Sequence, residues 1–118
     1  MPPNDPQRFL PLGTSVFHIL VALAGQDRHG YSIMQDVSMR TDGRIKLSPG
    51  TLYGAIRRLL EDGLILEVDS RSSLANDDPR RRYYRLTKLG HAVASAEASR
   101  LSSLLEQARD FGLLPRKI

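Results

Sequence analysis

Apolar side chains recur at helical spacing in the first third of the chain, which predicts two short helices. We expect the first to begin with Thr14 or Ser15 as its N-cap and to stop at Gly25. The second should run from about Gly30 to Met39. Each carries one apolar face, which predicts packing into a common core. The apolar positions are Val16, Ile19, Leu20 and Leu23 in the first helix and Tyr31, Ile33, Met34 and Val37 in the second.

A third helix has the clearest start in the chain. Ser48 is a good N-cap, and Pro49 suits the first helical position because the missing N–H would have no partner there. Gly63 should end this helix. Projected on a helix, its residues separate into a core face and a free outer face. The core face holds Leu52, Ile56, Leu59 and Leu60, and the outer face holds Gly50, Gly54, Arg57, Arg58 and Glu61.

The pattern then changes to one of strands. Branched side chains predict a strand over residues 64–68, and a second strand is expected over residues 82–86. The polar, irregular segment between them, residues 69–79, predicts a long hairpin loop. Two strands joined in this way form a wing beside the third helix.

A long final helix should follow, capped by Thr87. Its apolar positions approximate a heptad seam, broken by Arg100, and a stripe that long is more than a small domain can cover by itself. We therefore expect this helix to pack against a second copy of the chain, with the interface on Leu89, Val93, Ala96, Arg100, Leu101, Leu104, Ala108 and Phe111.

These elements predict a mainly α fold: a winged helix-turn-helix with a two-stranded wing and a long C-terminal dimerisation helix. Residues 1–13 hold four prolines and are expected to form a flexible, extended arm. The DNA-binding domain would span residues 14–87, the dimerisation helix residues 88–112, and the tail residues 113–118.

Composition narrows the function. The chain of 118 residues has a formal net charge of +4, and all of that excess lies between Arg40 and Lys88, which favours a phosphate-bearing partner. It lacks cysteine, a signal peptide and any apolar run of the roughly 20 residues that a membrane span needs, so we expect a cytoplasmic protein. We also expect no enzyme activity, no cofactor and no metal, because no catalytic grouping is recognisable. The three histidines have no ligand spacing, and His29 is expected to cap or pack.

The outer face of the third helix suits DNA reading. Its glycines let the backbone approach phosphates, its arginines can donate two hydrogen bonds to guanine, and its first turn binds phosphate through free N–H groups. The alternative is a solvated helix whose arginines only confer solubility. With the basic end of the wing included, the candidate DNA-binding residues are Lys46, Ser48, Gly50, Thr51, Tyr53, Gly54, Arg57, Arg58, Arg80, Arg81, Arg82 and Tyr83.

The wing arginines have an alternative of their own. Strand alternation puts Arg82, Tyr84 and Leu86 on one face and Arg81, Tyr83 and Arg85 on the other, so one set faces DNA at most. In the other interpretation, Arg82 or Arg85 forms an ion pair with Asp62, Glu67 or Asp69, and the tyrosines belong to the core.

Four ordered motifs resemble those of the PadR-type transcriptional regulators, over about residues 9–111. They are His29-Gly30-Tyr31-Ser32-Ile33, Pro49-Gly50-Thr51-Leu52-Tyr53-Gly54, the segment from Arg58 to Ile65, and the segment from Arg81 to Gly90. A single helix follows Thr87, as in the short subgroup of that family.

The resemblance implies a homodimer held by the C-terminal helix, which binds a two-fold-related operator on double-stranded DNA and often represses a nearby transporter or detoxification gene. It leaves a small-molecule effector of unknown identity open. The rival interpretations are a winged-helix module that contacts an acidic protein as an adaptor or antirepressor, an enzyme, and a DNA-binding activator or nucleoid-type protein.

Overall fold

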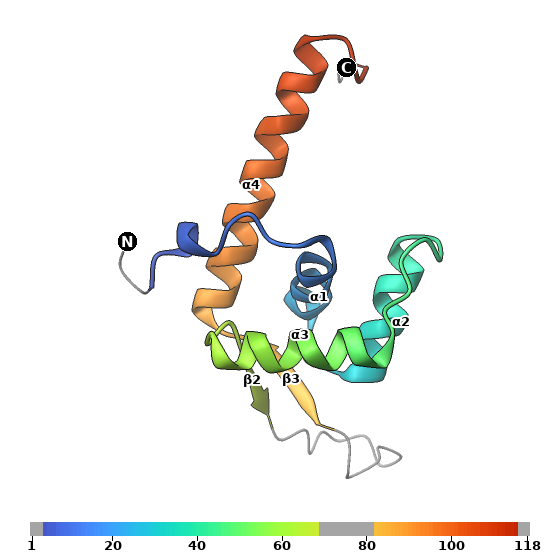
Figure 1. The fold of residues 1–118 in the computed structure, drawn as a ribbon, viewed down its shortest axis with the longest axis vertical. Helices are drawn as coiled ribbons and strands as arrows, with labels where there is room; N and C mark the ends of the chain where they lie inside the picture. The colour runs from blue at the N-terminus through green and yellow to red at the C-terminus, as the bar shows by residue number, and fades with distance from the viewer. Residues whose placement is uncertain (1–3, 69–81, 116–118) are drawn as a thin grey trace.

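The computed structural model describes residues 4–68 and 82–115, which form a mainly helical domain with a small antiparallel sheet. The sheet order is β1-β3-β2. Figure 1 shows the long helix α4 beginning beside the strands and projecting away at the top, while α3 and the β2–β3 hairpin lie at the bottom. The elements are η1 (Pro6–Phe9), α1 (Thr14–Gly25), β1 (Arg28–His29), α2 (Gly30–Arg40), α3 (Pro49–Glu61), β2 (Ile65–Val68), β3 (Tyr83–Leu86) and α4 (Lys88–Asp110).

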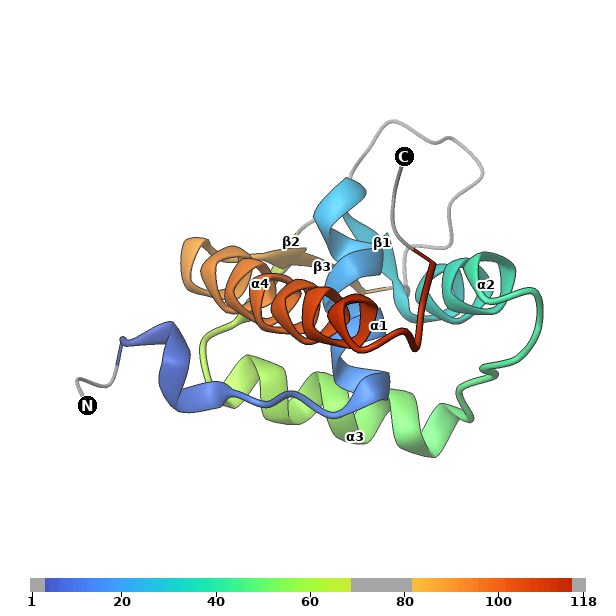
Figure 2. The same ribbon diagram turned by 90° about the horizontal axis from the view of Figure 1, so that it is seen from above.

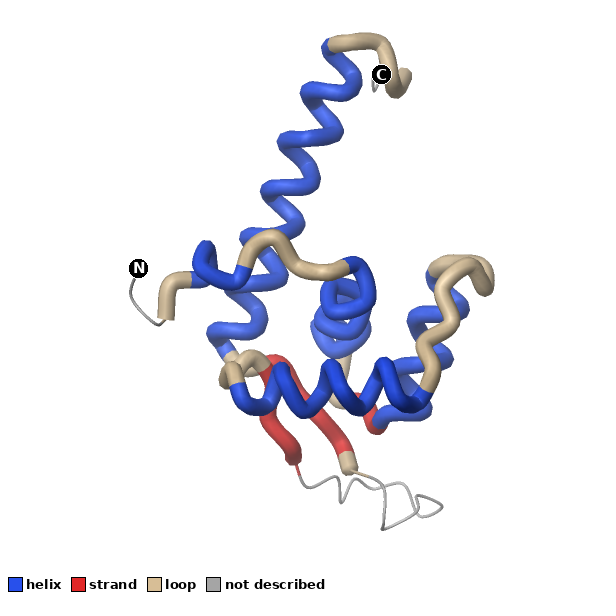
Figure 3. The backbone as a smooth tube through the Cα atoms, in the orientation of Figure 1, coloured by secondary structure: helices blue, strands red, loops and turns tan. Residues whose placement is uncertain are grey.

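The predicted winged helix-turn-helix is confirmed, with one strand that the sequence analysis missed. Arg28 and His29 form β1, which pairs antiparallel with Tyr84 and Tyr83 of β3. β2 pairs with the other edge of β3, from Ile65 opposite Leu86 to Val68 opposite Tyr83. The wing is therefore joined to the residues just before α2, and Figure 3 shows the strands beneath the helices. The predicted hairpin loop lies outside the described residues.

One core unites all the elements. It is formed by the predicted apolar faces of α1, α2 and α3, by the ends of the wing strands, and by the first half of α4. Leu60 was expected on the core face of α3 but is 36% exposed, because it lies at the edge of that face. The fully buried side chains are Ile19, Leu20, Ile33, Val37, Leu52, Leu64, Val93 and Glu97.

Residues before α1 do not form the free, extended arm that their prolines predicted. Pro6–Phe9 is a 3-10 helix capped by Asp5, and Phe9 and Leu12 pack against the core. The Leu12 N–H donates to a carboxylate oxygen of Glu97 on α4 at 3.0 Å. Residues 4–13, called the arm below, are therefore docked on α4 and α1, and the N-cap of α1 is Gly13 rather than Thr14 or Ser15.

Helix α4 has two different halves. In the first half Gly90 and Val93 are buried, so Val93 belongs to the monomer's core, and Leu89 packs against that core. The sequence analysis expected Leu89 and Val93 at a dimer interface. For Val93 that expectation is wrong, because its side chain is buried inside the monomer. Thr87 caps the helix as predicted, because its hydroxyl accepts the Gly90 N–H at 2.9 Å. A methyl group on Gly90 would overlap the Leu64 carbonyl, so only glycine lets α4 approach β2 this closely.

Beyond residue 101 the helix leaves the core and keeps an apolar surface. Leu104 is 48% exposed, Leu105 46% and Phe111 84%. Arg100, which breaks the predicted seam, donates two hydrogen bonds to the buried Glu97, at 2.6 and 3.0 Å. That guanidinium, aided by the arm's N–H, holds the pKa of Glu97 below its usual value although burial opposes this. A buried carboxylate thus marks the point where the helix leaves the domain.

Candidate nucleic-acid interface

The helix-turn-helix consists of α2, the turn after it, and α3. At the end of α2 the backbone takes left-handed conformations at Asp42 and Gly43, with φ of 52° and 76°. Thr41 closes the turn, since its hydroxyl donates to the Val37 carbonyl and accepts the Ile45 N–H. After this turn the chain runs back along α2, so that α3 begins near the start of α2, where Tyr53 lies against Gly30 (Figure 1).

A network of charges holds α2 in place. Arg28 donates to the Ala22 carbonyl at the end of α1, to the Ser32 hydroxyl and to the carboxylate of Asp36. Asp36 also accepts from Arg40 at 2.6 Å. Sequence reasoning missed these residues because their partners come from three separate segments. The network ties α2 to β1 and to the end of α1.

The start of α3 follows the prediction. The Ser48 hydroxyl accepts the Thr51 N–H at 3.1 Å, and Pro49 occupies the first turn. The Ser48 hydroxyl also donates a hydrogen bond to the Thr51 hydroxyl at 3.0 Å. Because both hydroxyls are exposed, the first turn of α3 presents two polar groups and its own N–H groups to solvent.

Tyr53 has a different place from the one predicted. Its hydroxyl lies against Gly30, the first residue of α2, where any side chain larger than hydrogen would overlap it. The ring is still 46% exposed. Tyr53 therefore packs α3 onto α2, which explains why a glycine follows His29, and this contact was not read from the sequence. His29 caps α2 as expected, since its Nδ1 accepts the Ser32 N–H.

The outer face of α3 is open and cationic. Lys46, Arg57 and Arg58 are exposed, and no ion pair joins any of them to another residue in the described part of the chain. A methyl group added to Gly50 or Gly54 would meet nothing within 4 Å. Packing within the monomer therefore does not require glycine at these two positions, unlike Gly30 and Gly90. A surface of this kind lets another molecule approach the helix backbone.

The described end of the wing agrees in part with the ion-pair interpretation. Arg82 lies 3.6 Å from Glu67, although its side chain is 72% exposed. Arg85 donates two hydrogen bonds to Asp27, at 3.0 and 2.8 Å. Tyr84 is buried, and burial raises the pKa of its phenol, with the Glu67 carboxylate adding to the effect. Tyr84 thus belongs to the core, as that interpretation expected.

Of the remaining candidates in the wing, the structure describes Tyr83. Tyr83 is half-buried, with its ring edge-on to the His29 ring at 5.1 Å between centroids. Arg80 and Arg81 lie outside the described residues, so their predicted contacts with DNA stay predictions. Along residues 4–68 and 82–115, no group of three or more histidine or acidic side chains could hold a metal ion. Nor is any helix there long and apolar enough to cross a membrane.

The positions of α3 and the wing agree with what sequence comparison finds. A family model described as the transcriptional regulator PadR-like family matches residues 19–96. The chain belongs to this family. PadR-like proteins are transcriptional regulators rather than enzymes, they bind DNA, and they are generally dimeric.

Similar proteins include transcriptional regulators from bacteria. The transcriptional regulator Rv3488 of Mycobacterium tuberculosis is 33% identical over 94 residues, which cover 76% of this chain and 78% of that protein. A PadR family transcription regulator from Clostridium difficile R20291 has a TM-score of 0.69 and 25% identity, covering 84% of this chain and 98% of that one. A transcriptional regulator from Clostridium thermocellum has a TM-score of 0.68 and 26% identity, covering 83% and 89%. The PadR-like chain thus shares its fold with regulators along most of its length.

Proposed function

We propose that this PadR-like protein is a homodimeric repressor that reads a two-fold-related operator, with α3 of each subunit in the major groove and the wing on the flanking phosphates. The observation that carries the proposal is the outer face of α3. Its cationic side chains lack ion pairs among the described residues, and its two glycines leave the backbone open. Arginines read guanine through paired hydrogen bonds, and a bare helix backbone can approach a phosphate closely.

The direct test is to select bound sequences from a random pool of duplex DNA. A dimer of this geometry should recover a two-fold-symmetric motif, with half-sites separated by about one helical turn. A nuclease footprint of defined length on that motif would separate an operator-binding regulator from a nucleoid-type protein. No enrichment at low salt, together with binding to an acidic polypeptide, would favour the adaptor interpretation instead.

Salt dependence tests whether the wing contributes phosphate contacts. The logarithm of the association constant should fall linearly with the logarithm of salt concentration, by about 0.9 for each phosphate neutralised. Neutralising Arg80 or Arg81 should weaken binding to every sequence alike and reduce that slope by about one unit each. A slope that is unchanged in both variants would remove these arginines from the interface.

The dimer is proposed from the second half of α4. Leu104, Leu105 and Phe111 give this half an apolar surface outside the domain, and such surfaces pack against a partner. Leu104→Glu should therefore sediment as a monomer and lose operator affinity. Ser102→Glu adds the same charge on the far side of the helix, about 160° around it from Leu104, and should remain a dimer. If both variants stay dimeric, another surface joins the subunits.

Repression is tested in a reporter strain. A promoter that overlaps the selected motif should be silenced when the protein is supplied, and Leu104→Glu should relieve the silencing. Increased transcription would make the protein an activator while leaving its DNA binding intact.

A further inference from the structure

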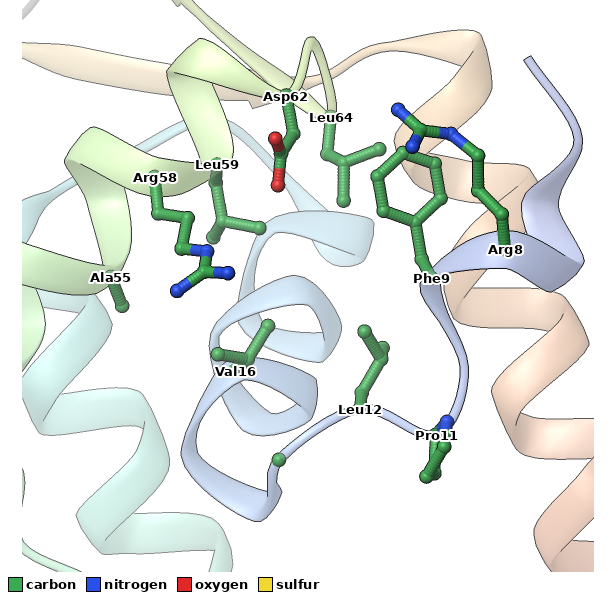
Figure 4. Close-up of a pocket in the computed structure, with 11 residues that line it drawn as sticks. Arg8, Phe9, Pro11, Leu12, Val16, Ala55, Arg58, Leu59, Asp62 and Leu64 are labelled. Carbon is green, nitrogen blue, oxygen red and sulfur yellow. The ribbon is translucent and has the colours of Figure 1, made fainter. Parts of the chain in front are cut away.

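A cavity of about 460 Å³ lies between the arm, the start of α1 and one flank of α3 (Figure 4). Seen from above in Figure 2 the arm passes over α3, whereas Figure 1 shows the two at different levels, and residues of both line the cavity. Volumes of this size hold small organic ligands. The flank of α3 that faces the cavity carries Ala55 and Arg58, and Asp62 follows at the end of the helix. Because Arg58 also belongs to the outer face of α3, the cavity meets the proposed DNA-reading surface at this residue.

Part of the cavity wall is apolar. Phe9 and Leu12 of the arm, Val16 of α1 and the buried Leu59 of α3 all line it. Figure 4 shows the Phe9, Leu12 and Val16 side chains directed into the same space. Such a wall favours a ligand with an alkyl or aryl body, because that body leaves water on binding.

The polar groups of the cavity carry a net positive charge. Arg8 and Arg58 supply two guanidiniums, and Asp62 supplies one carboxylate. Arg8 lies over the Phe9 ring, 4.3 Å from its centroid. The Arg58 side chain points into the cavity in Figure 4, and its guanidinium has no hydrogen bond or ion pair with any residue that the structure describes. A guanidinium without a protein partner beside an apolar wall is suited to an acid group.

The arm side of the cavity is held in place. The hydrogen bond from the Leu12 N–H to Glu97 fixes the arm to α4, and Glu97 is itself fixed by Arg100. A ligand would thus enter a site that already exists, so it would not bear the cost of ordering a loose segment.

We propose that this cavity binds a small amphipathic organic anion, with an alkyl or aryl body of about ten non-hydrogen atoms and one acid group that pairs with Arg58. Bound anion holds Arg58 on the arm side of α3 and so weakens operator binding. The second statement depends on the function proposed above, whereas the first does not. By linkage, operator DNA weakens the anion to the same extent, and couplings between sites are typically about 5- to 150-fold.

The site is tested first without DNA, with octanoate as the probe. Titration of isotopically labelled protein should give saturable amide shifts at Leu12, Gly13, Val16 and Ala55 in NMR spectra. Octanamide, which has the same chain without the charge, should bind at least about tenfold more weakly, because a hydrogen bond to a charged group is the stronger one. Equal binding of the amide, saturable shifts confined to the second half of α4, or no saturable shift at millimolar octanoate would each overturn the site.

Variants then separate the anchor from the wall. Arg58→Gln should weaken octanoate about tenfold. Arg57→Gln removes the same charge from the next residue, which does not line the cavity, and should leave octanoate binding unchanged. Leu12→Phe enlarges a side chain that is directed into the cavity and keeps both arginines, so it should block octanoate binding while preserving the circular dichroism spectrum. If Arg57→Gln weakens octanoate as much as Arg58→Gln, the anion is held by general charge and the site is wrong.

The link to DNA is tested with the selected operator. Saturating octanoate should lower operator affinity by at least about fivefold in the wild type and have no effect on Leu12→Phe. Binding of octanoate with unchanged operator affinity would overturn the coupling alone. A protein that binds octanoate but no DNA at any salt would overturn the repressor proposal and leave the anion site intact.

Discussion

Gly54 offers the sharpest separation of folding from DNA binding. It lies in the middle of α3, exposed, with nothing within 4 Å of an added methyl group. Alanine is about 0.5–1 kcal/mol more favourable than glycine inside a helix, and no overlap offsets that gain here. Gly54→Ala should therefore raise the free energy of unfolding by that amount and the Tm by roughly 2–6 °C.

The same substitution should damage DNA binding. A methyl group at Gly54 stands where the proposed duplex approaches the helix backbone, so we expect operator affinity to fall by about tenfold or more, equivalent to about 1.4 kcal/mol for each factor of ten. Thermal unfolding measures the first effect and a mobility-shift titration the second. Gly25→Ala at the end of α1 is the matched control, because its methyl group also meets nothing within 4 Å, and it should leave operator affinity unchanged.

The essential result is that the free energy of unfolding rises while operator affinity falls. A more stable protein with weaker operator binding would mean that glycine at position 54 serves the partner and not the fold. A Gly54→Ala variant that binds the operator as tightly as the wild type would refute the close approach of DNA to α3. A less stable variant would refute the open surface around this glycine.

Three further substitutions test other parts of the structure. Gly90→Ala should lower the free energy of unfolding by about 3 kcal/mol, since the methyl group meets backbone that cannot rotate away, and thermal denaturation will show it. Retention of the wild-type Tm would contradict the close contact between α4 and β2. Arg57→Ala should lower operator affinity by about 1–3 kcal/mol and relax the preferred base at one position of each half-site, as measured by repeating the DNA selection. Arg100 is the main cause of the lowered pKa of Glu97. The charged carboxylate therefore stabilises the folded state fully at pH values above the ordinary pKa of 4.5, and this stabilisation is lost as the pH falls through the lowered pKa of the folded state. The stability gap between wild type and Glu97→Gln should accordingly narrow in acid, in denaturant titrations between neutral pH and pH 3, and a constant gap would contradict the ionised state of Glu97.

Local chemistry accounts for what sequence reasoning predicted well. The starts of α3 and α4 depend on the hydroxyls of Ser48 and Thr87 and on the fixed φ of Pro49, all of which act within three residues. The apolar faces of the helices follow from periodicity alone. For the same reason the outer face of α3 was visible as a candidate site before any contact was known.

The features that were missed depend on distant partners. β1 is two residues long and exists only because β3 pairs with it, so no local pattern marks it. The arm docks through Glu97, which is 85 residues from Leu12. The heptad-like spacing in α4 continues from Val93 into the exposed half with a single interruption at Arg100, and periodicity cannot tell a monomer's core from a subunit interface.

The two residue pairs of β1 and β3 have a mechanical consequence. They connect the wing to the residue that caps α2, and Arg28 of the same strand is bonded to α2 through Ser32 and Asp36. A displacement of the hairpin should therefore also displace α2 and the helix α3 that packs on it. Contacts between the wing and one stretch of duplex would then set the tilt at which α3 meets the neighbouring bases. A change in the wing's contact with DNA would alter the contact made by α3, and a change at α3 would alter that of the wing.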